Sequence, residues 1–178
     1  PTVASGTACA VAPTSRRERV SVEAGATGTA DLLRFIDASP SPFHAVEVVA
    51  ERLRAAGFVE LVAAEAWPLE DGGGRFVRHA GAIVAWVGGG GRPDAPFRLI
   101  GAHTDSPNLR IKPRPDTGRV GYRQLGVEVY GGALLNSWLD RDLGLSGRVA
   151  LRSDHGVTTR LVRIDRPLLR VPQLPAHD

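Results

Sequence analysis

The chain has 178 residues, a formal net charge of +3, and 43% apolar against 23% charged residues. This length allows one ordinary domain and part of a second, and the apolar content excludes wholesale disorder. The single cysteine, Cys9, excludes an internal disulfide and a thiolate metal site, which favours a cytoplasmic protein over a secreted one. The apolar runs are too short for a membrane span, and the scattered arginines predict no nucleic-acid partner.

The N-terminal third is predicted to be helical after a disordered tail. Residues 1–29 are rich in Ala, Thr, Ser and Gly, a composition typical of disorder. Apolar residues at helical spacing then predict a short helix with Thr29 as its N-cap. Ser41 and Pro42 are typical of the N-cap and first turn of a second helix, which Gly57 is placed to close.

After the second helix the pattern changes to that of strands. Short strands are expected at residues 58–62 and 76–79. Nearly continuous apolar runs at residues 82–87 and 97–102 predict strands that are buried on both faces, as in the sheet of an α/β protein.

The half of the chain after Pro107 has an alternating pattern of apolar and polar residues. This pattern predicts antiparallel strands with one face in water. Residues 115–118, Pro-Asp-Thr-Gly, are a turn signal, and a second pair of alternating strands flanks residues 154–156. The predicted fold class is therefore α/β, with a β-rich part beginning at about Pro107.

The candidate site is the segment Ile-Gly-Ala-His-Thr-Asp-Ser-Pro at residues 100–107. In extended backbone His103 and Asp105 point the same way, so the carboxylate can orient one ring nitrogen and leave the other for a metal. A histidine that only hydrogen-bonds a turn carboxylate fits the same spacing, and both interpretations remain open here. The sequence has no HExxH, CxxC or adjacent Glu-Glu, so it holds no complete zinc site of a familiar kind.

Other polar groups have structural interpretations. His44 lies beside the apolar stripe of the second helix and is interpreted as structural, whereas His79 and His155 are expected at solvated strand ends or turns. Asp140 and Asp142 flank an arginine, so they fit either a cation site or an ion-paired turn. The sequence lacks both a Gly-x-Ser-x-Gly elbow for a nucleophilic serine and the Lys-Ser or Lys-Thr of a phosphate-binding loop.

Five separated segments carry a resemblance to a known family, and they occur in the family's order. They are SPSPFHA at 39–45, GAHTDSPNLR at 101–110, VEVYGG at 127–132, SWLDRDL at 137–143 with GRV at 147–149, and RPLLRVP at 166–172. With these segments the chain, from about Asp31 onward, resembles the aspartyl aminopeptidases, which are dodecameric metallopeptidases with a two-zinc site.

The resemblance implies a fold, a metal and roles for three residues. It implies that His103 is a zinc ligand and that Asp105 orients it. It also implies that residues 30–107 are the N-terminal part of the peptidase domain and that residues 108–178 are part of an inserted β-rich dimerisation domain. His177 matches a family histidine that reaches into the partner subunit's active site, where it helps to hold the substrate and stabilise the transition state. As the penultimate residue, His177 equally fits a frayed end.

The family's remaining metal ligands and its glutamate general base have no counterpart in this sequence. The leading hypothesis is therefore the N-terminal portion of a homo-oligomeric zinc aminopeptidase, with two zinc ions per complete active site, that releases acidic N-terminal residues from peptide substrates. The alternative is a non-catalytic oligomerisation or interaction module derived from that family.

Overall fold

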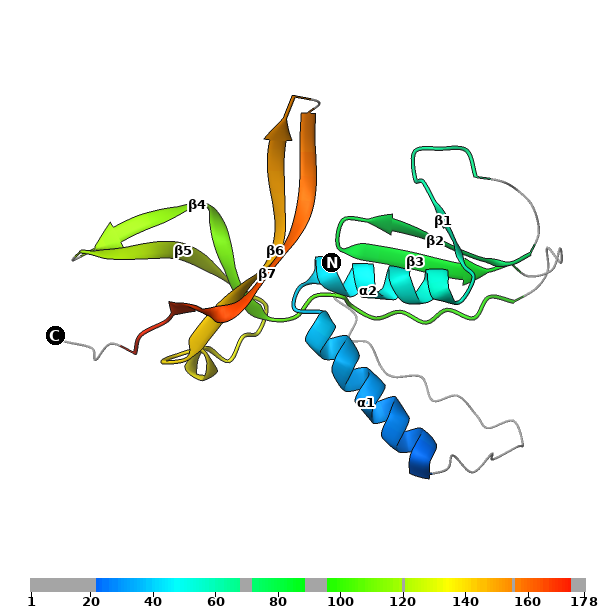
Figure 1. Cartoon of the computed structure of the whole chain (residues 1–178), viewed down its shortest axis with the longest axis horizontal. Coiled ribbons are helices and arrows are strands. Elements are labelled where there is room, and N and C mark those ends of the chain that lie inside the picture. Colours follow the sequence, from blue (N-terminus) through cyan, green and yellow to red (C-terminus); the bar gives the residue numbers. More distant parts are fainter. Residues whose placement is uncertain (1–21, 68–71, 89–95, 120, 155, 174–178) are drawn as a thin grey trace, which may run out of the picture. The chain divides into compact units, whose positions relative to one another are not determined.

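The computed structural model describes residues 22–67, 72–88, 96–119, 121–154 and 156–173. The chain divides into two units, Pro1–Arg34 and Phe35–Asp178. The elements in chain order are α1 (Val22–Ala38), α2 (Pro42–Ala55), β1 (Val59–Leu61), β2 (Gly74–His79), β3 (Ala82–Val87), β4 (Asn108–Arg119), β5 (Tyr122–Tyr130), the short 3-10 helix η1 (Leu135–Ser137), β6 (Asp142–Ser153) and β7 (Gly156–Arg170) (Figure 1).

Helix α1 begins earlier than the sequence predicts. It starts at Val22, so the predicted N-cap at Thr29 is wrong and the part of the predicted tail at residues 22–29 is helical. Those residues include no proline, and each glycine costs a helix only about 1 kcal/mol, so nothing stops the helix there. The other residues of the predicted tail, 1–21, lie outside the described residues.

Helix α2 has the two ends that its sequence predicts. The Ser41 hydroxyl accepts a hydrogen bond from the backbone N–H of His44 at 3.4 Å, and a proline follows in the first turn. At the other end Gly57 has a φ of +83°, a conformation that glycine adopts without strain. This turn lets the backbone N–H of Phe58 bond to the carbonyl of Leu53 at 2.9 Å, which closes the helix.

The small core lies between α2 and a three-stranded sheet. In that sheet β1 pairs with β2 in parallel, and β2 pairs with β3 antiparallel (Figure 1). Ala45, Val46 and Ala50 of α2 are buried together with Phe76 of β2. The predicted burial of residues 82–87 on both faces is wrong, because Val84 and Val87 of β3 are more than half exposed.

The predicted buried strand at residues 97–102 does not form. Residues 96–103 are extended without strand pairing, and the side chains of Phe97, Leu99 and Ile100 are 100%, 95% and 97% exposed. A continuous apolar run is typical of a strand that pairs with another strand at each edge and is covered by other elements on both faces. The described residues supply none of these neighbours, so the apolar run is left in solvent.

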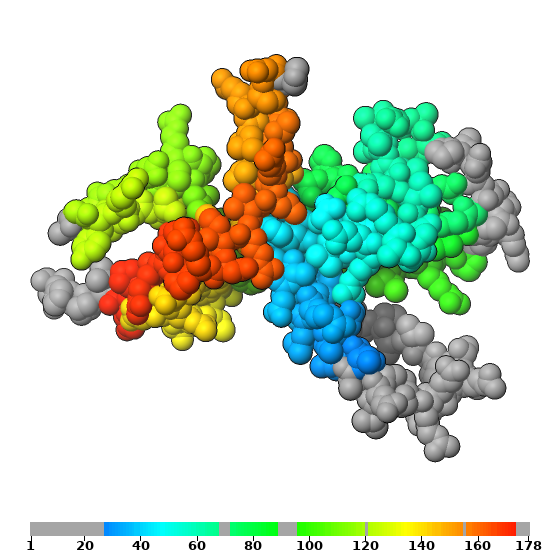
Figure 2. All heavy atoms as spheres, viewed as in Figure 1, coloured from blue at the N-terminus to red at the C-terminus, as the bar shows by residue number. Residues whose placement is uncertain are grey.

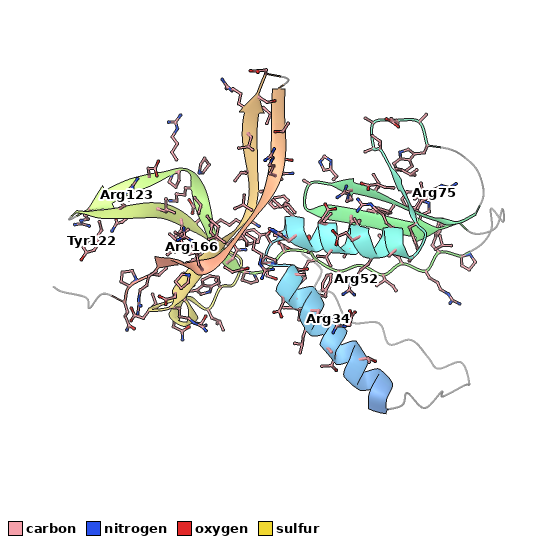
Figure 3. All side chains as sticks on the ribbon, viewed as in Figure 1. Arg34, Arg52, Arg75, Tyr122, Arg123 and Arg166 are labelled. Atoms are coloured by element: carbon pink, nitrogen blue, oxygen red, sulfur yellow. The ribbon has the colours of Figure 1, made fainter. Side chains whose placement is uncertain are left out.

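Two antiparallel hairpins follow, as the alternating pattern predicts. β4 pairs with β5, and β6 pairs with β7. The turn predicted at residues 115–118 is wrong: those residues continue β4 beyond a register shift, and the hairpin turns after Arg119 instead. Tyr122 and Arg123 therefore lie at the turn end of this hairpin (Figure 3).

The β6–β7 hairpin is exposed on both of its faces toward the turn, which differs from the predicted single wet face. Val149 and Leu151 are 39% and 41% exposed on one face, and Val157 is 71% exposed on the other. The atoms of this hairpin are drawn in orange in Figure 2.

The base of the β6–β7 hairpin contacts the corner between α1 and α2. The Ser146 hydroxyl donates to the carbonyl of Pro40 at 3.0 Å, and Arg163 donates to the carbonyl of Asp37. The guanidinium carbon of Arg148 lies 4.4 Å from the ring centroid of Phe43, in the first turn of α2.

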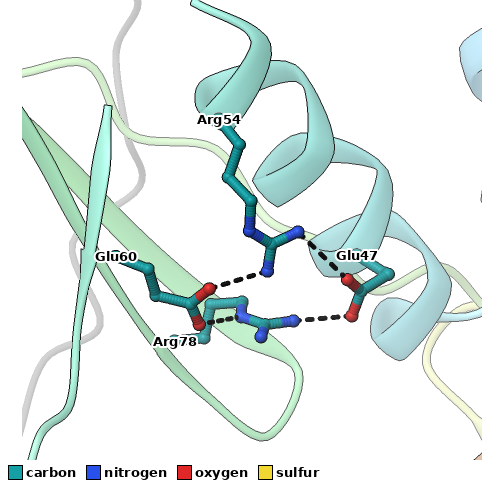
Figure 4. A network of polar contacts seen from close by, with 4 residues as sticks. All are labelled: Glu47, Arg54, Glu60 and Arg78. Atoms are coloured by element: carbon teal, nitrogen blue, oxygen red, sulfur yellow. Dashed lines mark hydrogen bonds and ion pairs between the residues drawn. The ribbon is translucent and has the colours of Figure 1, made fainter. Parts of the chain in front are cut away.

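Four charged side chains join α2 to the sheet (Figure 4). Arg78 donates to Glu47 and to Glu60, each at 2.6 Å, and Arg54 donates to the same two carboxylates at 3.5 and 2.6 Å. This group is called the charge network below. It borders a cavity of about 330 Å³ whose lining also includes residues of β6 and β7 but none of residues 100–107. None of the helices in the described part of the chain is long and apolar enough to cross a membrane.

Candidate metal-ligand site

His103 lies in the irregular segment between β3 and β4. Its side chain is 77% exposed, so the ring faces solvent instead of a core. The next residue holds the segment to the turn after β2, because the Thr104 hydroxyl donates to the carbonyl of Gly81 at 2.6 Å. The ring is therefore presented from a tethered loop, and not from the end of a strand as the sequence predicts.

Asp105 lies beside His103, as the spacing predicts, but the contact differs in detail. Ring atom Nδ1 of His103 hydrogen-bonds the backbone carbonyl of Asp105, and the carboxylate atom Oδ1 lies 3.4 Å from the same nitrogen. A carbonyl oxygen only accepts, so Nδ1 carries the proton. The lone pair of the neutral ring is then on Nε2, which is the nitrogen available to a metal.

Tyr130 is the site residue that sequence reasoning missed. Its hydroxyl donates a hydrogen bond to Asp105 Oδ2, the carboxylate oxygen that does not face His103. This bond holds the pKa of Asp105 below its ordinary value and raises the pKa of Tyr130. The available signal was Tyr130 itself, in the Val-Glu-Val-Tyr-Gly-Gly segment, but linking it to Asp105 requires the register of the hairpin.

That register comes from the β4–β5 ladder. Tyr130 pairs with Asn108, three residues after Asp105, so the end of β5 returns to the point where β4 begins. Arg110 lies on the same face, and its guanidinium carbon is 3.2 Å from the centroid of the Tyr130 ring. The ring of Tyr130 is thus held by a cation on its face and a carboxylate at its hydroxyl.

The described residues can supply some, but not all, of the ligands that a zinc ion needs. An imidazole with a free Nε2 and a nearby carboxylate suits zinc, but catalytic zinc needs about three protein ligands. No group of three or more His, Cys, Asp or Glu side chains that could hold a metal is found among the described residues. His103 can therefore supply one ligand, and no chemical step is assigned to a metal from these residues alone.

The two other described histidines, His44 and His79, are not brought to His103. His44 is half-buried with Nδ1 2.7 Å from the Ser41 hydroxyl, and burial followed by the charge of Arg163 lowers its pKa, in agreement with a structural role. His79 is exposed at the end of β2. His155 and the predicted site residue His177 lie outside the described residues.

The acidic pair Asp140 and Asp142 forms an ion-paired turn. Arg170 lies 3.9 Å from Asp140 and 3.5 Å from Asp142, and the Asp140 carboxylate accepts the backbone N–H of Gln173 at 3.2 Å. These contacts favour the structural interpretation of this pair over a cation site.

Comparison with known proteins identifies the family. The family model described as "Aminopeptidase I zinc metalloprotease (M18)" matches residues 35–177. The chain belongs to the M18 family. This agrees with the resemblance drawn from the five sequence segments, and the family is one of zinc metalloproteases.

Relatives and solved structures of M18 proteins match most of this chain. A probable M18 family aminopeptidase 2 of Streptomyces avermitilis is 60% identical over 150 residues, which are 84% of this chain and 34% of the relative. The cryo-EM structure of a complex of Ape4 and Nbr1 has a chain that is 41% identical, with a TM-score of 0.79, and the match covers 86% of this chain and 31% of that one.

A third similar protein is the mApe1 dodecamer of S. cerevisiae. It is 30% identical with a TM-score of 0.71, and the match covers 82% of this chain and 35% of that one. This M18 chain spans about a third of the length of the curated relatives it matches. The likeness extends to the α/β character of the fold, because the described chain combines helices with sheets as expected.

Proposed function

We propose that this M18 chain supplies part of the active site of a zinc aminopeptidase that releases acidic N-terminal residues from peptides. The observation that carries the proposal is the orientation of His103, whose protonated Nδ1 faces Asp105 and leaves Nε2 for a metal. Membership of a zinc metalloprotease family supports the choice of metal. The preference for acidic residues rests on the resemblance to the aspartyl aminopeptidases.

The residues of this chain have separate roles in the proposal. His103 holds one zinc ion through Nε2, and Asp105 is a positioning residue that fixes the ring and its proton. Zinc, when bound, supplies a Lewis acid that polarises a carbonyl and lowers the pKa of a bound water. His177 is proposed to contact the substrate in a partner subunit's site, and the remaining ligands and the general base are supplied from outside this chain.

The proposal extends to assembly and location. Residues 30–107 are proposed to be the N-terminal part of the peptidase domain, and residues 108–178 to be part of an inserted dimerisation domain. A homo-oligomer is supported by the S. cerevisiae relative, which is a dodecamer. A cytoplasmic location is supported by the single cysteine.

The experiment uses the complete gene product that carries this chain. We expect it to purify with zinc and to hydrolyse peptides with N-terminal Asp or Glu faster than those with N-terminal Leu. His103→Ala is expected to lower the zinc content and reduce hydrolysis by at least about 100-fold, in line with the large effects of losing a metal ligand or its support. His79→Ala, at an exposed strand end, is the matched control and should retain both. Full zinc content and activity in His103→Ala would contradict the proposal.

A second candidate function is a non-catalytic oligomerisation or interaction module. Two observations favour it: the described residues hold no group of three metal-binding side chains, and the β6–β7 hairpin is exposed on both faces. Sedimentation together with metal analysis of the complete gene product separates the two. A discrete oligomer without zinc and without hydrolysis favours the module, whereas zinc bound in proportion to protein favours the enzyme.

A further inference from the structure

The strongest unassigned feature is a chain of contacts that runs from the β4–β5 hairpin to the proposed zinc ligand. Tyr130 donates to one oxygen of Asp105, and the other oxygen lies 3.4 Å from Nδ1 of His103. We propose that Tyr130 is a positioning residue of the zinc site, acting on His103 through the carboxylate of Asp105. This inference rests on the proposed function.

The geometry of the carboxylate gives the first argument. Asp105 is about a third exposed, with 37% of its side-chain surface open to solvent, so water competes for both oxygens. A carboxylate that is free to rotate would spend part of its time turned away from the imidazole. The hydrogen bond from Tyr130 occupies Oδ2, and this leaves Oδ1 as the oxygen that faces the ring.

The second argument is that Tyr130 is itself fixed in place. Its backbone pairs with Asn108 at the end of the β4–β5 ladder, and the Arg110 guanidinium stacks on its ring. The next residue, Gly131, has a φ of +67° and packs against Pro107, where an added Cβ would lie 3.5 Å from the proline. The hydroxyl is therefore delivered to Asp105 by rigid elements, which is the requirement for a positioning group.

The third argument is where these residues occur in the chain. His103 and Asp105 precede the predicted boundary at Pro107, whereas Tyr130 lies 25 residues beyond Asp105 on the hairpin that follows. The hydrogen bond thus links the β-rich part to the side chain that orients the ligand. In this proposal Tyr130 acts on His103 through Asp105.

The test measures zinc affinity in the complete gene product by competition with a chelator. Tyr130→Phe removes the hydroxyl and retains the ring on which Arg110 stacks. Loss of a residue that supports a metal ligand weakens metal affinity about 10- to 100-fold, and Tyr130 is one bond further out, so we expect a loss of about 3- to 10-fold. The visible spectrum of the Co²⁺-substituted protein should shift, and kcat should fall with KM unchanged.

The matched control is Tyr122→Phe. Tyr122 is the chain's other tyrosine, is 73% exposed, and lies at the turn end of the same hairpin (Figure 3). This variant should keep the zinc affinity and the Co²⁺ spectrum of the wild type. A zinc affinity in Tyr130→Phe within twofold of wild type, with an unchanged Co²⁺ spectrum, overturns the inference.

A double-mutant cycle separates positioning from general destabilisation. In an Asp105→Ala background, Tyr130→Phe should cause no further loss of zinc affinity, because the side chain that accepts the Tyr130 hydrogen bond is gone. An additive loss overturns the inference, including the case in which Tyr130→Phe merely loosens the fold. A wild-type protein without zinc, or His103→Ala with full zinc affinity, contradicts the proposed function itself and is thereby distinguished from failure of the Tyr130 inference alone.

Discussion

The Nε atom of Arg78 on β2 lies 2.6 Å from the carboxylate of Glu60 on the neighbouring strand β1. The same guanidinium reaches Glu47 on α2 through Nη1, also at 2.6 Å. One side chain of β2 therefore joins β2 to a strand and to the helix (Figure 4). Phe76 on the same strand is fully buried, and the guanidinium carbon of Arg54 lies 5.8 Å from its ring centroid, so the charge network borders the small core.

Removing Arg78 should loosen both connections. Arg78→Ala removes one of the two arginines from each carboxylate and leaves Glu47 only the 3.5 Å contact with Arg54. Both carboxylates are about a third exposed, so we expect a cost of about 1–2 kcal/mol. Hydrogen exchange of the β1 and β2 amides should rise by about 5- to 30-fold. The control is Arg75→Ala on the same strand, whose side chain bonds only to the carbonyl of Gly72 in the described structure. Equal effects of the two substitutions would contradict a special role for Arg78.

The same network predicts a loss of stability in acid. Partial burial acts to raise the pKa of Glu60, but hydrogen bonds from Arg54 and Arg78 outweigh it and hold that pKa below its ordinary value of 4.5. A carboxylate with a lower pKa in the folded state stabilises the fold at pH above 4.5, and this contribution is lost as the pH falls through the folded value.

Glu60→Gln tests that pH dependence through the melting temperature of the complete gene product. The variant should melt below the wild type near neutral pH, because glutamine has no charge for the two arginines. The difference should shrink as the pH falls from 4.5 through the lowered pKa of Glu60 in the folded protein. A gap that stays constant from neutral to acid pH would show that Glu60 acts through packing alone.

Gly144 should be the glycine of β6 that is least tolerant of a side chain. It lies at the register shift between Leu143 and Leu145, and an added Cβ would collide with the backbone carbonyl of Ile164 on β7. Because the obstacle is backbone, we expect Gly144→Ala to cost about 1–3 kcal/mol. Gly132→Ala is the control, with nothing within 4 Å of the new Cβ. Exchange of the β6–β7 amides should increase only in the first variant.

Two neighbouring serines should respond in opposite ways to the same substitution. Ser41 caps α2, so Ser41→Ala is expected to cost about 1 kcal/mol. The Ser39 hydroxyl is buried without a hydrogen-bond partner among the described residues, so Ser39→Ala should be neutral or stabilising. The melting temperatures of the two variants give the ranking, and the reverse order would contradict these assignments.

Two features set by local sequence were predicted well, whereas two others, the N-cap at Thr29 and the turn at residues 115–118, were not. The caps of α2 depend on Ser41, Pro42 and Gly57 and on residues within one turn of them, and they form as expected. The β6–β7 hairpin also forms where two alternating segments flank residues 154–156. In both cases the signal and the structure that it specifies lie only a few residues apart.

Features that depend on distant partners were predicted poorly. The apolar run at residues 97–102 encodes burial, but burial requires neighbouring strands that the described residues do not supply. The His103–Asp105 contact could be predicted because it spans two residues. Tyr130 could not, because its hydrogen bond to Asp105 depends on the strand register of the β4–β5 hairpin.

Residues 97–100 directly precede the His103 loop in the chain. The three large apolar side chains of this segment, Phe97, Leu99 and Ile100, are almost fully exposed to water. The side-chain hydrogen bonds that hold this loop in the described structure are made by residues after His103, namely Thr104 and Asp105. The imidazole is thus anchored from one side only. Pairing of the backbone of residues 97–100 with another strand would restrict the ring further, and in the proposed zinc site such ordering would be thermodynamically linked to metal binding.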